Sequence, residues 1–131
     1  MTSLSVAMPA YNEEANIEPM INMVCAKVGP LVDDLEIVVC NDGSADATGK
    51  VLQRVCLENP RVRVVEHPEN QGYGAAVYDA IWATSKEIIF VTDSDLQFDL
   101  SELARFLPLI GKADLVIGYR YARSDPWYRR L

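Results

Sequence analysis

Short apolar runs alternate along this sequence with longer segments that carry apolar residues at helical spacing. The runs are predicted to be strands, and they lie at residues 4–8, 35–40, 62–65, 87–92 and 115–117. The fourth run contains Ile88-Ile89-Phe90-Val91, a composition typical of a buried strand in a parallel sheet. The pattern therefore predicts a sheet built from short strands that are separated by helices.

Helices are predicted between these runs and before the last of them. The first begins after Asn16, a good N-cap residue, and stops at Gly29-Pro30. Gly72-Tyr73-Gly74 opens the third, and the spacing of Asp99 and Glu102 predicts a capping box before the fourth. This alternation favours an α/β fold, a doubly wound and mostly parallel sheet with helices on both faces.

Size and composition fit one globular domain. The chain has 131 residues, and 50% of them are hydrophobic. The formal charge of −7 argues against general binding to nucleic acid phosphates. No apolar stretch reaches the length of a membrane span, and the N-terminus lacks a signal pattern. Cys25, Cys40 and Cys56 lie in apolar segments, so we expect reduced core thiols in a cytoplasmic protein.

Polar residues gather where the predicted strands end. Tyr11-Asn12-Glu13 follows the first strand, Asn41-Asp42 the second, Asp93 and Asp95 the fourth, and Arg120 the fifth. Ligands bind at the carboxyl ends of the strands in an open parallel sheet, so these loops predict one acidic cleft with an arginine at its rim. Each group alone also fits a plainer interpretation as a solvated loop, a turn or a surface charge. Their coincidence on one edge favours a binding site.

Asp93 and Asp95 are candidate metal ligands. They end an apolar run and stand one residue apart, and Gln97 adds an amide oxygen nearby. Mg²⁺ and Mn²⁺ prefer oxygen ligands and often share them with substrate phosphates. Two acidic residues in a turn are a weak signal alone, so the interpretation as a metal site depends on the other motifs along the chain.

Five motifs occur in order along the chain. They are Val6-Ala7-Met8-Pro9-Ala10-Tyr11-Asn12-Glu13-Glu14, Asn41-Asp42-Gly43-Ser44, Asn70-Gln71-Gly72-Tyr73-Gly74-Ala75-Ala76, Asp93-Ser94-Asp95-Leu96-Gln97 and Gly118-Tyr119-Arg120. Together they resemble the family 2 glycosyltransferases, which have a GT-A fold. The set is most similar to the branch of polyprenyl-phosphate glycosyltransferases that includes dolichol-phosphate mannosyltransferase, and it covers nearly the whole chain.

The resemblance implies a role for each matching residue. Asp93, Asp95 and Gln97 would hold Mg²⁺ or Mn²⁺. Arg120 would meet the donor or acceptor phosphates, so the implied catalytic residues are Asp93, Asp95 and Arg120. Tyr11 would lie near the base, and Asp42 would accept a hydrogen bond from the base or ribose. The implied nucleotide-sugar pocket consists of Pro9, Ala10, Tyr11, Glu13, Asp42, Gly72, Gly74, Ala75 and Ser94.

The same resemblance implies an inverting transfer of a sugar from a nucleoside diphosphate sugar to a polyprenyl phosphate, in glycan biosynthesis. An ionised phosphate acceptor needs no strong general base, whereas a hydroxyl acceptor would need one. Residues 1–119 would form the donor-binding domain. Residues 120–131, basic and aromatic, would lead to an acceptor and membrane-interface region, and without that region we expect transfer near background. The full protein is expected in the cytoplasm, at the cytoplasmic face of a membrane.

Other functions stay open at this point. A non-catalytic module that binds nucleotide sugars, or a family 2 transferase acting on a saccharide hydroxyl, would carry the same motifs. A response-regulator receiver would need a lysine after the fifth strand, where this chain has Gly118-Tyr119-Arg120. A dinucleotide-binding oxidoreductase would need a glycine-rich turn after the first strand, where this chain has Pro9-Ala10-Tyr11. The sequence predicts neither the sugar, nor the base, nor the oligomeric state.

Overall fold

A computed structural model of the chain describes residues 1–118, and its centre is a sheet of four parallel strands. The strands are β1 (Ser3–Ala10), β2 (Asp34–Asp42), β3 (Val62–His67) and β4 (Ile88–Val91), in the spatial order β3-β2-β1-β4. β1 and β2 pair in register from Ser3 opposite Asp34 to Ala10 opposite Asn41. The predicted parallel sheet is confirmed.

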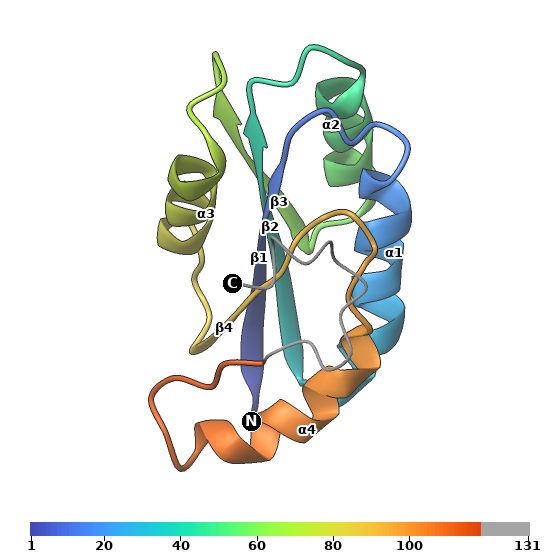
Figure 1. Cartoon of the computed structure of the whole chain (residues 1–131). Coiled ribbons are helices and arrows are strands. Elements are labelled where there is room, and N and C mark those ends of the chain that lie inside the picture. The colour runs from blue at the N-terminus through green and yellow to red at the C-terminus, as the bar shows by residue number, and fades with distance from the viewer. Residues whose placement is uncertain (119–131) are drawn as a thin grey trace.

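Helices cover both faces of this sheet, as predicted (Figure 1). One face carries α1 (Ile17–Lys27) and α2 (Thr48–Glu58), and α4 (Leu103–Ile110) packs beside them. The other face carries α3 (Tyr73–Trp82). Short 3₁₀ turns at Gly29–Leu31 and Leu100–Glu102 follow α1 and precede α4. No helix within residues 1–118 is long and apolar enough to cross a membrane.

Alternate residues of the central strands fill two separate cores. The larger one joins one face of the sheet to α1, α2 and α4; its fully buried members include Leu4, Val6, Met8, Ile17, Met20, Ile21, Ile37 and Leu52. The smaller one packs Ala76 and Ala80 of α3 against Ala7, Val38 and Cys40. Alanines on α3 let the helix lie close to β1 and β2. All three cysteines are free thiols, and Cys40 is the fully buried one.

Two strand predictions differ from the structure. β4 lies at an edge of the sheet, so Ile89 and Val91 are 42% and 41% exposed, because α3 covers mainly β1 and β2. Residues 115–117 form no strand, and Leu115 and Ile117 are 72% and 78% exposed. A run of three apolar residues becomes a strand only where a neighbouring strand pairs with it, and no strand within residues 1–118 does so.

Two helix ends form at the predicted positions but with different contacts. Asn16 precedes α1, yet its amide donates to Glu13 Oε2 at 3.0 Å and makes no cap. Asp99 accepts from the backbone N–H of Ser101 at 3.1 Å, and no reciprocal bond from Glu102 is formed. The tight 3₁₀ turn brings the Ser101 N–H to Asp99 first, while the Glu102 N–H binds the Asp99 carbonyl at 3.1 Å.

The loops that follow β2 and β3 touch each other through their backbones. Gly43 has a φ of +65°, and a Cβ atom there would lie 2.3 Å from the backbone N of Asn70 and the carbonyl C of Glu69. The loop after β1 joins the same group, because Asn12 Oδ1 accepts from the backbone N–H of Ala45 at 2.8 Å. A side chain at position 43 would therefore force two loops apart.

We expect Gly43→Ala to destabilise the protein by about 2–4 kcal/mol, because alanine must adopt a left-handed backbone and displace neighbouring main-chain atoms. Gly74→Ala is the matched control, since it has no positive φ and no atom lies within 4 Å of its Cβ position. In the first turn of α3, alanine should cost nothing or stabilise slightly. Urea unfolding measures both variants, and equal stabilities would contradict the close approach of the loops.

Candidate functional site

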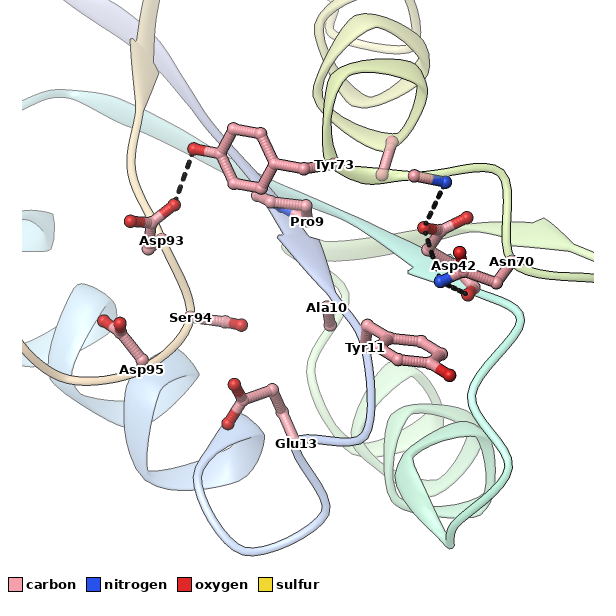
Figure 2. A pocket seen from close by; sticks show the side chains of 12 residues that line it. Pro9, Ala10, Tyr11, Glu13, Asp42, Asn70, Tyr73, Asp93, Ser94 and Asp95 are labelled. Atoms are coloured by element: carbon pink, nitrogen blue, oxygen red, sulfur yellow. Dashed lines mark hydrogen bonds between the residues drawn. The ribbon is translucent and has the colours of Figure 1, made fainter. Parts of the chain in front are cut away.

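A cavity of about 470 Å³ opens at the carboxyl ends of β1, β2 and β4, beside the first turn of α3 (Figure 2). Its lining residues are Pro9, Ala10, Tyr11, Glu13, Asp42, Asn70, Gly72, Tyr73, Ala76, Asp93, Ser94 and Asp95. The volume is that of a pocket for a small molecule. The loops after β1, β2 and β4 therefore converge on one edge of the sheet as the sequence predicted for them.

The cavity brings together most of the residues predicted for the site. Those that line it are Pro9, Ala10, Tyr11, Glu13, Asp42, Gly72, Asp93, Ser94 and Asp95. Gly74, Ala75 and Gln97 do not line it, and their roles stay predictions. α3 begins at Tyr73, so its rotation turns Tyr73 and Ala76 toward the cavity and the two residues between them away. Arg120 and the segment 120–131 lie outside the described residues.

Sequence reasoning assigned no role to three residues that line the cavity: Asn70, Tyr73 and Ala76. Asn70 and Tyr73 belong to the motif at residues 70–76, in which the glycines give the stronger signal. Ala76 follows Tyr73 by three positions, so a helical projection of α3 from its first residue would have found it.

Asp93 and Asp95 form the acidic wall of the cavity. The Thr92 N–H donates to the Ala7 carbonyl at 3.1 Å, which extends the pairing of β4 with β1 by one residue up to the carboxylates. The loop then turns at Leu96, whose φ of +65° is uncommon for a bulky side chain. Leu96 packs against the larger core. This packing fixes the loop that carries both carboxylates.

Tyr73 connects α3 to the acidic wall. Its hydroxyl donates to Asp93 Oδ1 at 2.7 Å across the cavity (Figure 2). That hydrogen bond and, second to it, burial raise the pKa of Tyr73 to about 12. The hydroxyl therefore stays protonated at neutral pH and remains a donor to Asp93.

The donor set of the acidic wall fits a hard divalent cation. Hydrogen bonds within residues 1–118 use only the Oδ1 atoms of Asp93 and Asp95. In the same part of the chain, no group of three or more His, Cys, Asp or Glu could hold a metal ion. Mg²⁺ commonly takes only one or two protein carboxylates and completes its shell with water and substrate phosphates. The residues present fit a cation shared with a bound diphosphate.

Asp42, in another wall of the cavity, has a carboxylate engaged by protein groups. His67 Nδ1 and the Gln71 N–H each lie 2.8 Å from its Oδ1, while Asn70 Nδ2 and the Gly72 N–H lie 3.1 and 3.0 Å from its Oδ2. Burial alone would raise the pKa of Asp42, but hydrogen bonds from Gln71, His67 and Gly72 outweigh it and hold the pKa below its ordinary value. Asp42 thus holds the turn after β3; its contact with a base stays a prediction.

The loop after β1 supplies Tyr11 and Glu13. Tyr11 is 49% exposed, and it lines the cavity together with Asp42 (Figure 2). The backbone N–H of Glu13 donates to Thr48 Oγ1 at 2.9 Å, which anchors the loop to α2. The Glu13 side chain extends toward Ser94 (Figure 2). The loop therefore offers an aromatic surface on one side and a carboxylate on the other.

Several relatives of this chain are transferases whose names contain a polyprenyl phosphate. It is 35% identical over 129 residues to dolichyl-phosphate hexose transferase from Haloferax volcanii, covering 98% of this chain and 52% of the relative. It is 30% identical over 134 residues to dolichol-phosphate mannosyltransferase from Pyrococcus furiosus, covering 98% of this chain and 37% of the relative. It is 29% identical over 130 residues to undecaprenyl-phosphate 4-deoxy-4-formamido-L-arabinose transferase from Edwardsiella ictaluri, covering 97% of this chain and 40% of the relative. The chain thus spans about half the length of these relatives or less.

Solved structures of glycosyltransferases share the fold. A mannosyltransferase from Pyrobaculum calidifontis, in complex with GDP-Man and Mn²⁺, superposes with a TM-score of 0.68 at 29% identity, covering 79% of this chain and 31% of that one. A second structure is that of glucosyl-3-phosphoglycerate synthase from Mycobacterium tuberculosis in complex with Mn²⁺, UDP and glucosyl-3-phosphoglycerate. It superposes with a TM-score of 0.58 at 33% identity, covering 84% of this chain and 39% of that one. These matches confirm the predicted GT-A fold.

A model of the family described as "Glycosyl transferase family 2" matches residues 5–131. The match begins in β1 and extends over every strand and helix that builds the cavity. On this evidence the chain belongs to glycosyl transferase family 2.

Proposed function

We propose that this chain binds a nucleoside diphosphate sugar and transfers the sugar, with inversion, to the phosphate of a polyprenyl phosphate. The observation that carries the proposal is the cavity, where Asp93 and Asp95 share one space with Tyr11 and Asp42. An aromatic surface and a pair of carboxylates suit the two ends of a nucleoside diphosphate. The acceptor class is supported by the names of the relatives.

The two ends of the donor have distinct places in this cavity. The base and ribose would lie against Tyr11, near Asp42. The diphosphate would lie by the first turn of α3, because the N-terminus of a helix carries partial positive charge and unpaired N–H groups. Gly72, just before α3, has no atom within 4 Å of its Cβ position, which leaves room for the phosphates.

The acidic wall needs positive charge before a diphosphate can approach it. Asp93 and Asp95 would hold Mg²⁺ or Mn²⁺ there, and Gln97 is proposed as a further ligand. When bound, the cation would neutralise the negative charge that develops on the departing diphosphate. Tyr73 keeps Asp93 oriented through its 2.7 Å hydrogen bond. The described residues therefore bind and orient the donor.

A polyprenyl phosphate is ionised near neutral pH, so its oxygen attacks the sugar without a strong general base. Arg120 is proposed to meet the donor or acceptor phosphates. Because such an acceptor is anchored in a bilayer, we place the reaction at the cytoplasmic face of a membrane. Residues 1–119 would serve the donor, and the segment 120–131 would lead toward the acceptor.

Nucleotide binding is expected to depend on the divalent cation. Calorimetric titration of UDP and GDP with Mn²⁺ should give a dissociation constant at least about tenfold lower than in EDTA, since a charge-assisted contact is lost without the cation. Asp95→Asn should remove most of this difference without lowering the melting temperature, because it relieves repulsion between two carboxylates. Asp114→Asn, the same change outside the cavity, is the control. Equal affinity in Mn²⁺ and EDTA would exclude the proposed metal site.

Sugar transfer tests the acceptor class. A thermal-shift screen of UDP-, GDP- and CMP-sugars with Mn²⁺ selects the donor, which is then radiolabelled and incubated with a polyprenyl phosphate in detergent. We expect labelled lipid to form above the level of the Asp95→Asn control, because that variant lacks one of the two carboxylates proposed to hold the cation. Donor binding without labelled lipid would indicate a binding module, and label transferred to a saccharide offered in a parallel incubation would indicate a hydroxyl acceptor.

A further inference from the structure

His67, the last residue of β3, lies between two carboxylates. Its Nδ1 is 2.8 Å from Asp42 Oδ1, and its Nε2 is 2.6 Å from Asp79 Oδ2. The His67 and Asp42 side chains are 5% and 3% exposed, whereas the Asp79 side chain is 41% exposed. One buried imidazole ring therefore joins the end of β2 to α3.

The geometry requires a proton on both ring nitrogens of His67. Ionised carboxylates only accept hydrogen bonds, and a neutral imidazole has a single N–H, so it can donate to Asp42 or to Asp79 but not to both. The hydrogen bonds to Asp42 and then to Asp79 raise the pKa of His67 above its ordinary value, in agreement with this geometry. His67 is thus an imidazolium that bridges two anions.

Two further titratable groups lie near His67. Cys40 Sγ on β2 is 3.6 Å from Nε2; burial and, after it, the charge of Asp42 raise the pKa of Cys40 to about 12, so the thiol is neutral. Glu66, the neighbour of His67 on β3, accepts instead from Asn41 Nδ2 at 2.9 Å. Of the groups on β2 and α3, only Asp42 and Asp79 contact the ring as anions.

The two partners of His67 belong to two walls of the cavity. Asp42 holds the turn at residues 70–72 through the N–H groups of Gln71 and Gly72. Asp79 lies on α3, the helix whose first residue, Tyr73, donates to Asp93 in the acidic wall. A shift of the His67 ring would therefore move both the turn and the helix.

We propose that protonated His67 is a positioning residue of the nucleotide-sugar pocket, which holds the 70–72 turn and α3 in the arrangement that forms both walls. His67 does not line the cavity, so it acts through Asp42 and α3. The identity of the ligand as a nucleotide sugar rests on the proposed function. The positioning of the 70–72 turn and α3 by His67 is a property of the chain without any ligand. A raised pKa means that this stabilisation is complete below about pH 6.5 and is lost as the pH rises through the folded-state pKa.

The test compares His67→Gln and Asp79→Asn with wild type by NMR. Amide hydrogen exchange of Gln71 and Gly72 reports the turn, and the imidazole resonances report the pKa of His67. We expect protection of both amides to fall by about tenfold or more in His67→Gln, the effect of losing a hydrogen bond to a charged group. In wild type, protection should be complete below about pH 6.5 and decrease as the pH rises through the raised pKa of His67, and Asp79→Asn should lower the imidazole pKa and move this decrease to lower pH.

Arg63→Gln is the matched control. It breaks the 2.8 Å ion pair of β3 with Glu36 and the 2.9 Å hydrogen bond to the Ala83 carbonyl, which lie at the ends of β3 and α3 away from the cavity. It should leave the protection of Gln71 and Gly72 and the affinity for UDP or GDP unchanged. His67→Gln should weaken that affinity by about tenfold, in parallel with the loss of protection.

The outcomes separate this inference from the proposed function. Unchanged protection of Gln71 and Gly72 in a folded His67→Gln variant would overturn the inference even if the wild type binds nucleotide. A wild type that binds neither UDP nor GDP would overturn the proposed function, while the exchange measurement would still decide the role of His67. If His67→Gln does not fold, an imidazole pKa at or below about 6.5 in wild type would overturn the inference.

Discussion

Parallel pairing of β1 with both of its neighbours is the constraint on which the cavity depends. Ala10 lies opposite Asn41 on one side, and Ala7 lies opposite Val91 on the other. Three loops therefore leave the sheet at the same edge, and short polar contacts such as that of Asn12 with Ala45 fasten them together. If any one of these strands ran the other way, its loop would lie at the opposite end of the sheet, and the cavity would lose a wall.

The walls of the cavity differ in how completely their charges are satisfied. Asp42 receives two donors on each carboxylate oxygen, so its wall is organised by the protein before any ligand arrives. Asp93 and Asp95 each use one oxygen within residues 1–118. Their remaining capacity suits a positively charged partner. The site thus combines a rigid wall with one whose electrostatics are completed on binding.

Local sequence patterns predict most of the strands and helices, whereas they do not predict contacts between residues that are distant in the sequence. Strand and helix positions follow from apolar runs and helical spacing, and the site residues follow from their place after strands. The exposure of Ile89 depends on strand order, which no local pattern encodes. Leu115 was misassigned because pairing decides whether a short apolar run becomes a strand. No local pattern marks His67, because its partners Asp42 and Asp79 lie 25 and 12 residues away in the sequence.

The position of β4 at the edge of the sheet has an energetic consequence for the site. β4 is four residues long and, within residues 1–118, pairs with β1 alone. Such a strand detaches at lower cost than the central pair of β1 and β2, because less buried surface and fewer backbone contacts must be given up. Opening of β4 would move Asp93 away from the cavity while the wall that contains Asp42 stays folded. A ligand that spans both walls therefore also clamps the edge of the sheet, and its binding free energy adds to the local stability of β4.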